Sequence, residues 1–407
     1  MVAEYQQEVE LSGHLIDSQI LSKVWDKILE MGGDFEDLDF RLGKTNKDES
    51  YAKILVKGRS KEHLNRILNE INVFGVVTPQ KGINLEIVKK DGVAPDNFYS
   101  TTNHPTFVFL GDEWIRVEKL RMDAMIVVGE NAKKAFCKKL AKLKVGESVV
   151  VGVDGVRVEP MERPRKRGIF EFMASTVSSE RDMKLHIRGV AKEMKDTKSK
   201  GGKIVFVVGP AVIHTGGDDA LSEIIKMGYV SALLGGNAVA VHDIEKQLYG
   251  TSLGIDVTTG IGKKGGHKNH MRAINVVRGA GSIEGAIDKG ILKGGIMYQL
   301  VKNRIPYVLA GSLRDDGPLP GVIMNMEEAQ DGYSDAVKDA DIVVMMASML
   351  HSIATGNMLP ANAKTVCVDI NPAVVTKLVD RGTSQAIGMV TDVGLFLDRL
   401  RGELIRD

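Results

Sequence analysis

Two hydrophobic periods alternate along the first 80 residues of the chain. Apolar side chains recur at every second position in three segments, as in half-buried strands, and at helical spacing in two others. The predicted strands are 9–16, 34–42 and 51–57, and the predicted helices are 18–31 and 61–73. Ser18 is the expected N-cap of the first helix, and Gly32-Gly33 are expected to end it. This order predicts a ferredoxin-like α+β domain over residues 1–80.

Between residues 81 and 165 the apolar runs become short and are separated by glycines. Segments such as TFVFLG, EWIRVE and AMIVVG predict strands, and one helix is expected at 132–144. We therefore predict a β-rich module over 81–165, which the charged stretch EPMERPRKRG closes. Residues 166–202 are expected to form a connecting helix at 183–195 and the polar linker KDTKSKGGK.

Apolar strands alternate with helices from residue 203 onward. This order predicts an α/β domain over 203–407, built on a mostly parallel sheet with helices on both faces. The expected strands are 204–208, 230–234, 305–309, 342–346, 365–370 and 386–389, and the expected helices include 219–227, 295–304 and 334–340. Ligands of such sheets bind at the carboxyl ends of the strands, so functional residues are expected just after each strand.

Polar residues and glycines gather at those strand ends and are the candidates for binding a cofactor. They are Gly209, Asn237, Ala238, Asp316, Ser348, Met349, Leu350, His351, Asp369, Asn371, Thr391 and Asp392. Asp369 ends a buried strand, where a carboxylate can accept both ribose hydroxyls and would repel a 2′-phosphate. This position favours NAD over NADP, although a turn-capping role for Asp369 is the alternative.

A literal G-x-G-x-x-G motif occurs at Gly260, Gly262 and Gly265, but its context does not fit dinucleotide binding. No convincing strand precedes it, and the following GKKGGHKNH is too polar to begin a buried helix. We expect a loop here. The nucleotide contacts must therefore be built without the three-glycine fingerprint.

Composition narrows the range of partners. The 54 Lys and Arg residues nearly balance the 53 Asp and Glu residues, so the net charge of +1 favours neither nucleic acid nor an anionic membrane. The two cysteines are far apart and predict neither a disulfide framework nor a metal site. No apolar run approaches the ~18 residues of a membrane span, and no targeting pattern is present, so we expect a soluble cytoplasmic protein.

Two polar stretches in the β-rich module do not look like scaffold. NFYSTTNHPT, at 97–106, has no strand or helix period and contains Asn103 and His104. It is either a solvated loop or a loop that faces the substrate. Arg121 and Asp123 stand just before the strand AMIVV. They form either a surface ion pair or, in the case of Arg121, a bidentate clamp for a carboxylate.

Two stretches of the α/β domain carry a resemblance to known proteins. GGNAVAVHDIE at 235–245, and IPY with LRDDG within 305–317, resemble corners of deoxyhypusine-synthase-like domains, which bind NAD without the three-glycine fingerprint. The whole chain is similar to the LOR/SDH conserved-region family and, within it, to the archaeal-type ornithine cyclodeaminases. The most specific matching stretches are FYSTTNHPT, RMD, SSERD and GGNAVAVHDIE.

This resemblance implies a tightly held NAD, a homo-oligomer, and conversion of L-ornithine to L-proline with loss of ammonia. Such a reaction oxidises Cα transiently, cyclises through the δ-amine, loses ammonia and is reduced again, so no net redox change occurs. Two alternatives stay open. One is a saccharopine-type dehydrogenase that accumulates NADH, and the other is an NAD-sensing binding protein with a regulatory N-terminal domain.

The implied chemistry needs a cation for the substrate carboxylate, an anion for the δ-ammonium group and a base that works near pH 7. The candidates are Arg121 or Arg314 for the carboxylate, Asp123 or Asp315 for the ammonium group, Asn103 as a further substrate contact, and His242 or His104 as the base. Each histidine has a structural alternative, as a buried hydrogen-bond donor. Lys263, His267 and His270 belong to the polar segment and are less favoured as bases.

Overall fold

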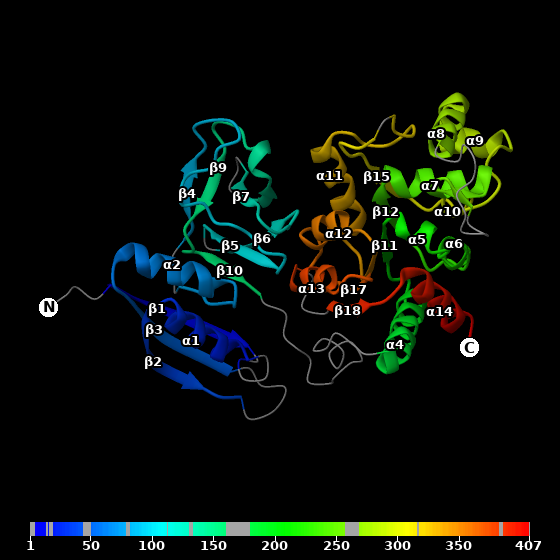
Figure 1. Cartoon of the computed structure of the whole chain (residues 1–407). Helices are drawn as coiled ribbons and strands as arrows, with labels where there is room; N and C mark the ends of the chain where they lie inside the picture. Colours follow the sequence, from blue (N-terminus) through cyan, green and yellow to red (C-terminus); the bar gives the residue numbers. More distant parts are fainter. Residues whose placement is uncertain are drawn as a thin grey trace. The chain divides into compact units, whose positions relative to one another are not determined.

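The computed structural model describes residues 5–13, 15, 19–43, 50–78, 82–111, 113–129, 133–159, 180–256, 268–315, 317–381 and 386–406. The chain divides into two compact units, residues 1–167 and 168–407, each with its own sheets (Figure 1). Among the described residues, no helix has both the length and the apolar character needed to cross a membrane.

The N-terminal part of the first unit has the predicted order strand, helix, strand, strand, helix. Its elements are β1 (Tyr5–Gly13), α1 (Ile20–Glu30), β2 (Asp34–Arg41), β3 (Ser50–Gly58) and α2 (Lys61–Asn72). The strands pair antiparallel in the order β1-β3-β2. Val77, which follows α2 in the sequence, forms an isolated antiparallel bridge with Glu10 of β1. Ser18, the predicted cap of α1, lies outside the described residues, and Gln19 is the residue before that helix.

Seven short strands form the rest of the first unit. They are β4 (Asn84–Ile87), β5 (Thr106–Leu110), β6 (Glu113–Glu118), β7 (Met125–Val128), β8 (Ala135–Lys138), β9 (Ser148–Val151) and β10 (Val156–Val158). Their order in the sheet is β10-β5-β6-β8-β7-β9-β4, and most neighbours are antiparallel. The prediction of a β-rich segment is confirmed here.

The predicted helix at 132–144 is wrong. The described part of this segment forms strand β8 and then a single 3₁₀ turn, η1 (Leu140–Lys142). Ala135 and Cys137 alternate into the core, and β8 pairs with β6 on one side and β7 on the other. The run of Ala, Lys and Leu favours a helix locally. The edges of β6 and β7 present backbone N–H and C=O groups, and a strand between them can form hydrogen bonds with both. The tertiary context therefore overrides the local helix preference.

One apolar core is shared by the three-stranded and the seven-stranded sheet. Asn72, at the end of α2, donates to the carbonyls of Val76 and Val156 and accepts a hydrogen bond from the Tyr99 hydroxyl at 2.7 Å. A buried amide that leaves these groups unpaired would cost about 1–3 kcal/mol, so the contacts fix how α2 docks on β10. The two predicted N-terminal segments therefore pack together in one unit.

The second unit is a series of parallel strands connected by helices. In chain order the elements are α4 (Glu180–Ser199), β11 (Ile204–Val208), α5 (Ala211–His214), α6 (Asp218–Lys226), β12 (Ala232–Gly236), α7 (Asn237–Tyr249), β13 (Thr251–Ser252), β14 (Ile255–Asp256), α8 (Asn269–Ala280), α9 (Ile283–Asp288), α10 (Ile296–Lys302), β15 (Tyr307–Ala310), α11 (Met326–Val337), β16 (Ile342–Met346), α12 (Met349–Gly356), β17 (Lys364–Asp369), α13 (Pro372–Arg381), β18 (Ala386–Val390) and α14 (Val393–Ile405). The predicted α/β architecture is confirmed.

Six of these strands form a parallel sheet in the order β15-β12-β11-β16-β17-β18. The chain starts in the middle at β11, moves outward through β12 to β15, and returns to the other side of β11 at β16. This is the strand order of the Rossmann fold, whose ligands bind where the direction reverses. The carboxyl ends of all six strands lie along one edge of the sheet, with the reversal between β11 and β16.

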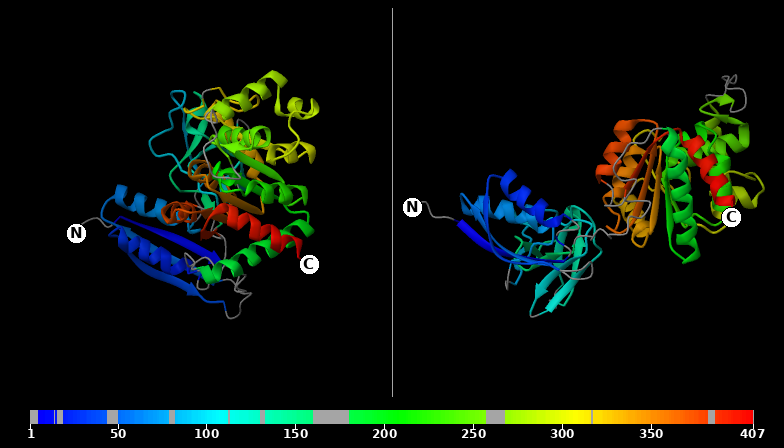
Figure 2. Two further views of the ribbon diagram at one scale, coloured as in Figure 1. Left: turned by 45° about the vertical axis from the view of Figure 1, so that its right-hand side comes forward. Right: turned by 90° about the horizontal axis from the view of Figure 1, so that it is seen from below.

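Alternate residues of each strand face two separate cores. Phe206 and Val208 of β11 pack with α4 to α10 and α14, whereas Val205 and Val207 pack with α11 to α13. The right-hand view of Figure 2 shows the sheet edge-on, with orange helices on one side and the green α4 and red α14 on the other. Continuous apolar strands are stable here because helices cover both faces.

Candidate active site

The loops after β11 and β16 approach each other backbone to backbone at the reversal point. The N–H of Gly209 donates to the carbonyl of Met346 at 2.9 Å. A Cβ on Gly209 would lie 1.8 Å from the carbonyl oxygen of Ala347, which itself has a positive φ of 50°. Only glycine fits at the first position after β11, because any side chain there would collide with the backbone after β16.

Helix α7 begins at the carboxyl end of β12 without a side-chain cap. Its N-cap is Gly236, where a Cβ would lie 3.0 Å from the His351 ring. The side chain of Asn237 is turned to other partners, since it donates to Asp315 at 3.0 Å and accepts from the N–H of Leu319 at 3.1 Å. No side chain in the described structure caps the first N–H groups of α7, and such groups attract anions. Ala238 follows in the same first turn.

Arg314 and Asp315 lie in the loop after β15. Asp315 uses both carboxylate oxygens within the protein, because Oδ1 accepts from Asn237 and Oδ2 accepts from the N–H of Ser312 at 2.6 Å. Arg314 is exposed. Asp316 lies outside the described residues. The loop is therefore tied to the start of α7 through Asp315, while the neighbouring Arg314 side chain is exposed to solvent.

Helix α12 begins at the same edge, directly after β16. Ser348 is its N-cap, and the Ser348 hydroxyl lies 2.8 Å from Nδ1 of His351. Burial lowers the pKa of His351, while the carboxylate of Asp315 acts in the opposite direction. Met349 and Leu350 are exposed, the latter at 74%. An apolar surface therefore lies beside the polar start of α12.

Asp369 is the last residue of β17, Asn371 follows that strand, and Thr391 and Asp392 follow β18, as predicted. Asp369 accepts from the N–H of Asn371 at 2.8 Å, so it caps its own turn through Oδ1. Thr391 donates its N–H to the carbonyl of Asp369 at 3.1 Å. Asp392 is the N-cap of α14 and accepts from the N–H of Leu395 at 2.9 Å. These contacts place the four residues side by side at the end of the sheet.

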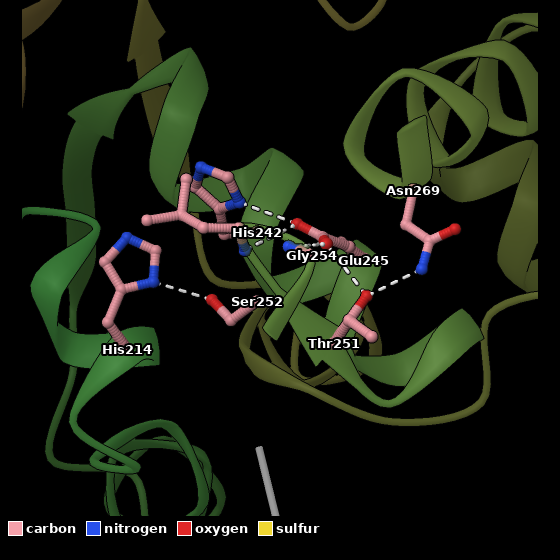
Figure 3. A network of polar contacts seen from close by, with 8 residues as sticks. His214, His242, Glu245, Thr251, Ser252, Gly254 and Asn269 are labelled. Atoms are coloured by element: carbon pink, nitrogen blue, oxygen red, sulfur yellow. Dashed lines mark hydrogen bonds and ion pairs between the residues drawn. The ribbon is translucent and has the colours of Figure 1, made fainter. Parts of the chain in front are cut away.

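Three histidines from three different helices converge in the second unit. The ring centroid of His214, in α5, lies 4.9 Å from that of His242, in α7, and the His270 centroid, in α8, lies 6.5 Å from that of His242. Figure 3 shows His242 bonded to Glu245 and His214 bonded to Ser252. The corresponding distances are 2.8 Å from His242 Nδ1 to Glu245 Oε2 and 2.6 Å from His214 Nδ1 to Ser252 Oγ.

Glu245 is fully buried and accepts four hydrogen bonds. Oε1 accepts from Thr251 Oγ1 at 2.9 Å and from the N–H of Gly254 at 3.1 Å, and Oε2 accepts from His242 and from the N–H of Leu253 at 3.3 Å. Burial alone would raise the pKa of Glu245, but the bonds from His242, Thr251 and Gly254 outweigh it and hold the pKa below its usual value. The carboxylate is therefore ionised inside the protein.

The two polar stretches of the first unit lie side by side. The Thr101 hydroxyl donates to the carbonyl of Arg121 at 2.5 Å, and the N–H of Asp123 donates to the carbonyl of Thr101 at 2.9 Å. Asn103 is buried in the same loop. Nδ1 of His104 is buried with no hydrogen-bond partner among the described residues, and burial lowers the pKa of His104. These four predicted residues thus gather at one place.

Three family models match the chain in succession. The LOR/SDH bifunctional enzyme conserved region matches residues 6–104, and the first region and Rossmann fold of the arginine dihydrolase ArgZ-like C-terminal part match 105–187 and 188–400. The ornithine cyclodeaminase of Methanocaldococcus jannaschii is 54% identical, covering 98% of this chain and 96% of the relative. That of Methanopyrus kandleri is also 54% identical, covering 100% and 98%. The chain belongs to the ornithine cyclodeaminase family.

Solved structures of related proteins have the same fold. Apo ArgZ, a cyanobacterial arginine dihydrolase, is 45% identical with a TM-score of 0.85, covering 99% of this chain and 59% of that one. A LOR/SDH protein from Methanococcus maripaludis S2 is 52% identical with a TM-score of 0.74, covering 80% and 97%. A ternary complex of AgrE with ornithine and NAD⁺ is 45% identical with a TM-score of 0.54, covering 99% and 58%.

Sequence reasoning missed two residues of the cluster around His242, namely Glu245, which has a weak signal, and His214. Glu245 is three positions after His242, a spacing that places both side chains on one helix face. His214 has no local signal, because its neighbours come from α7 and the β13–β14 hairpin.

His270 is the less favoured histidine that the fold brings near the cluster, whereas Lys263, His267 and the 260–265 glycine motif lie outside the described residues. No group of three or more His, Cys, Asp or Glu side chains within the described ranges is placed to bind a metal ion.

Proposed function

We propose that this chain is an NAD-dependent ornithine cyclodeaminase, a lyase that converts L-ornithine to L-proline and ammonia. The observation that carries the proposal is the 54% identity to ornithine cyclodeaminases over 98% of the chain. The AgrE structure that contains ornithine and NAD⁺, which aligns with 99% of this chain, supports the same substrate and cofactor. All atoms of ornithine are recovered in proline and ammonia, so the reaction consumes no oxidant.

The carboxyl edge of the six-stranded sheet fits a dinucleotide. Helices α7 and α12 begin there without side-chain caps in the described structure, so their first N–H groups can bind phosphate oxygens. Gly209 and Gly236 allow close approach to the backbone, since a Cβ at either position would contact neighbouring atoms at 3.0 Å or less. Leu350 and Ile370 are 74% and 73% exposed at this edge and offer apolar surface for the planar rings.

In this proposal the strand-end residues hold NAD. Gly209, Asn237 and Ala238 would contact the pyrophosphate, and Asp369 would accept ribose hydroxyls through the oxygen that does not cap its turn. The remaining cofactor contacts would come from Ser348, Met349, Leu350, His351, Asn371, Thr391 and Asp392, with Asp316 proposed from sequence alone. Bound NAD supplies a hydride acceptor for Cα of ornithine and later a hydride donor for the cyclic imine.

The chain's own polar residues have the remaining tasks. Arg121 is the proposed partner of the substrate carboxylate, with Arg314 second. Asp123 is preferred over Asp315 for the δ-ammonium group, because both oxygens of Asp315 already accept hydrogen bonds. His242 is the proposed base, and the atom that takes the proton is Nε2. Asn103 and His104 are proposed as further contacts to the substrate, with His104 the alternative base.

We also propose the cellular setting. The enzyme would act in the cytoplasm as a homo-oligomer, forming proline from ornithine, and would bind neither nucleic acid nor membranes. The balanced charge supports the last point, because a net charge of +1 provides no general attraction to polyanions. Size-exclusion chromatography with light scattering would measure the oligomeric state directly.

The test is a turnover assay on the purified full chain with added NAD. L-ornithine should give ammonia and L-proline in equal amounts, while the absorbance of NADH does not grow during turnover. Steady accumulation of NADH would instead indicate a dehydrogenase. Binding of NAD with no turnover of ornithine would reject the proposed activity and favour an NAD-sensing role.

A further inference from the structure

A carboxylate without access to water needs a compensating environment, and Glu245 has one. The ion is fully buried, and two donors on each oxygen replace the water that it has lost. Removing a charged group from water costs several kcal/mol, and this cost is recovered only when its lone pairs are satisfied. Three of the four donors, from Thr251, Leu253 and Gly254, belong to the β13–β14 hairpin, and the fourth is His242. The fold therefore builds a complete anion site that includes one histidine.

This arrangement fixes the tautomer of His242. An ionised carboxylate can only accept a hydrogen bond, so Nδ1 of His242 must carry the hydrogen at the 2.8 Å contact with Glu245. In the neutral ring, Nε2 is then the atom with the free lone pair. The His242 side chain is 10% exposed, so the ring is largely buried. A histidine held in this way is suited to carry a proton at Nε2.

Two of the helices around this pair begin at the carboxyl edge of the sheet. α7 starts at the carboxyl end of β12, and α5 starts directly after Gly209 and Pro210 at the reversal point of the sheet. The helices that carry His242 and His214 therefore begin at the proposed cofactor edge, whereas the β13–β14 hairpin follows the far end of α7. Ligands of this fold lie at that edge. His242 is in the second turn of α7, about 8 Å along the helix axis from its first residue, so it is the member of the pair nearer to the edge.

We propose that Glu245 is a positioning residue, which holds Nδ1–H of His242 so that Nε2 carries the proton during ornithine cyclodeamination. The role rests on the proposed function. An N–H bond of the substrate α-ammonium group breaks as an N–H bond forms on Nε2. The same proton returns to the α-nitrogen when its bond to carbon breaks and ammonia leaves. The protein is therefore unchanged after one turnover, and the hydride acceptor is the proposed NAD.

Other titratable groups face the pair from the elements packed against α7. His214 contributes its ring from α5, and its pKa is lowered by partial burial and by the nearby His242, with Glu245 acting in the opposite direction. His270 contributes from α8. On α7 itself, Lys246 is paired with Asp218 of α6 at 2.6 Å. Within the described residues, Glu245 is the carboxylate that contacts His242, so its replacement is the direct test of how the ring is held.

The decisive variant is Glu245→Gln. Its amide presents a donor or a carbonyl at the position of the carboxylate, removes the charge and no longer enforces Nδ1–H on His242. We expect kcat to fall about 10²–10⁴-fold, the usual range for loss of acid–base catalysis, with a small change in KM for ornithine.

Asp243→Asn is the matched control. Asp243 is a fully buried carboxylate on the same helix, but its oxygens accept from the N–H groups of Ile296 and Met297 at the start of α10. Its replacement should change stability and leave kcat and its pH profile close to those of the wild type. Equal losses of kcat in the two variants would show that Glu245 acts only through folding, and would overturn the proposal.

A second measurement is made on the wild-type chain, so it depends neither on turnover nor on whether Glu245→Gln folds. In the ¹⁵N-histidine-labelled full chain without NAD, the His242 signals, identified by their loss in His242→Gln, should show a protonated Nδ1 and a bare Nε2. The opposite tautomer would overturn the proposal. If the tautomer is as expected but the wild type does not convert ornithine, the proposed function fails, and the catalytic role of Glu245 fails with it. Turnover by the wild type with unchanged kcat in Glu245→Gln would reject Glu245 alone.

Discussion

A methyl group on Gly209 tests whether the close backbone contact at the reversal point supports both the sheet and the cofactor edge. In Gly209→Ala the new Cβ would lie 1.8 Å from the carbonyl oxygen of Ala347, and ordinary contact begins near 3.4 Å. The two loops must therefore separate by about 1.6 Å. The clash is with backbone, so no change of side-chain rotamer can relieve it.

The cost has two parts. Separation breaks the 2.9 Å hydrogen bond from Gly209 to Met346, which contributes about 1 kcal/mol. Forcing an extra carbon into a packed site adds about 1–3 kcal/mol of strain. We therefore expect the free energy of unfolding to fall by about 2–4 kcal/mol. The separation displaces the ends of both β11 and β16, which form the proposed cofactor edge. The Kd for NAD should therefore rise at least about tenfold, which corresponds to 1.4 kcal/mol.

Urea unfolding followed by circular dichroism measures the first effect, and calorimetric titration with NAD measures the second. Gly402→Ala is the control, because Gly402 lies in α14, has ordinary backbone angles and faces open space at its Cβ position. That change should stabilise the protein by about 0.5–1 kcal/mol, as alanine does in a helix. If Gly209→Ala stayed within 0.5 kcal/mol of the wild type and bound NAD normally, the reasoning about this contact would be refuted.

Three further predictions concern single side chains. Asp369→Ala should lose bound NAD while remaining folded, as measured by cofactor released on denaturation; retained NAD would remove Asp369 from the proposed site. Arg121→Ala should raise the KM for ornithine about ten- to a hundredfold and leave the Kd for NAD nearly unchanged, since a charge-assisted contact contributes about 1.5–3 kcal/mol. An unchanged KM would shift the role to Arg314. Burial raises the pKa of Asp243 to about 7, so the folded state holds a proton that the unfolded chain has lost, and stability should fall as the pH rises from about 4 to 7. Asp243→Asn should flatten this slope in urea unfolding at pH 5, 6, 7 and 8, and an unchanged slope would contradict the assignment.

Periodicity was sufficient where a segment's own side chains decide its structure. The apolar run 204–208 is a strand because five consecutive buried side chains need cover on both faces, and it is β11 in the fold. The positions of Asp369 and Asp392 at strand ends were predicted in the same way, because the apolar runs 365–370 and 386–389 mark where the strands end. The segment at 132–144 shows the limit. Its composition favours a helix, and the strand β8 forms because β6 and β7 flank it.

Local sequence patterns could not predict contacts between residues far apart in the chain. Asn237 and Asp315 are 78 positions apart, and their hydrogen bond exists because β12 and β15 are neighbours in the sheet. The bond also occupies the carboxylate of Asp315, which the sequence alone left as a candidate for binding the substrate. Thr101 joins two polar stretches of the first unit that look independent along the chain.

The sequence by itself determined the parallel α/β architecture of the second unit, the strand ends that carry its polar residues, and the likeness to NAD-using ornithine cyclodeaminases. These follow from short periods and local motifs, which depend on neighbours a few residues away. Only the tertiary structure decided that His214, His242 and Glu245 form one cluster and that Glu245 is buried as an ion. Burial and hydrogen-bond partners come from segments that fold against one another, and the energy of a charge depends on that surrounding rather than on its place in the chain.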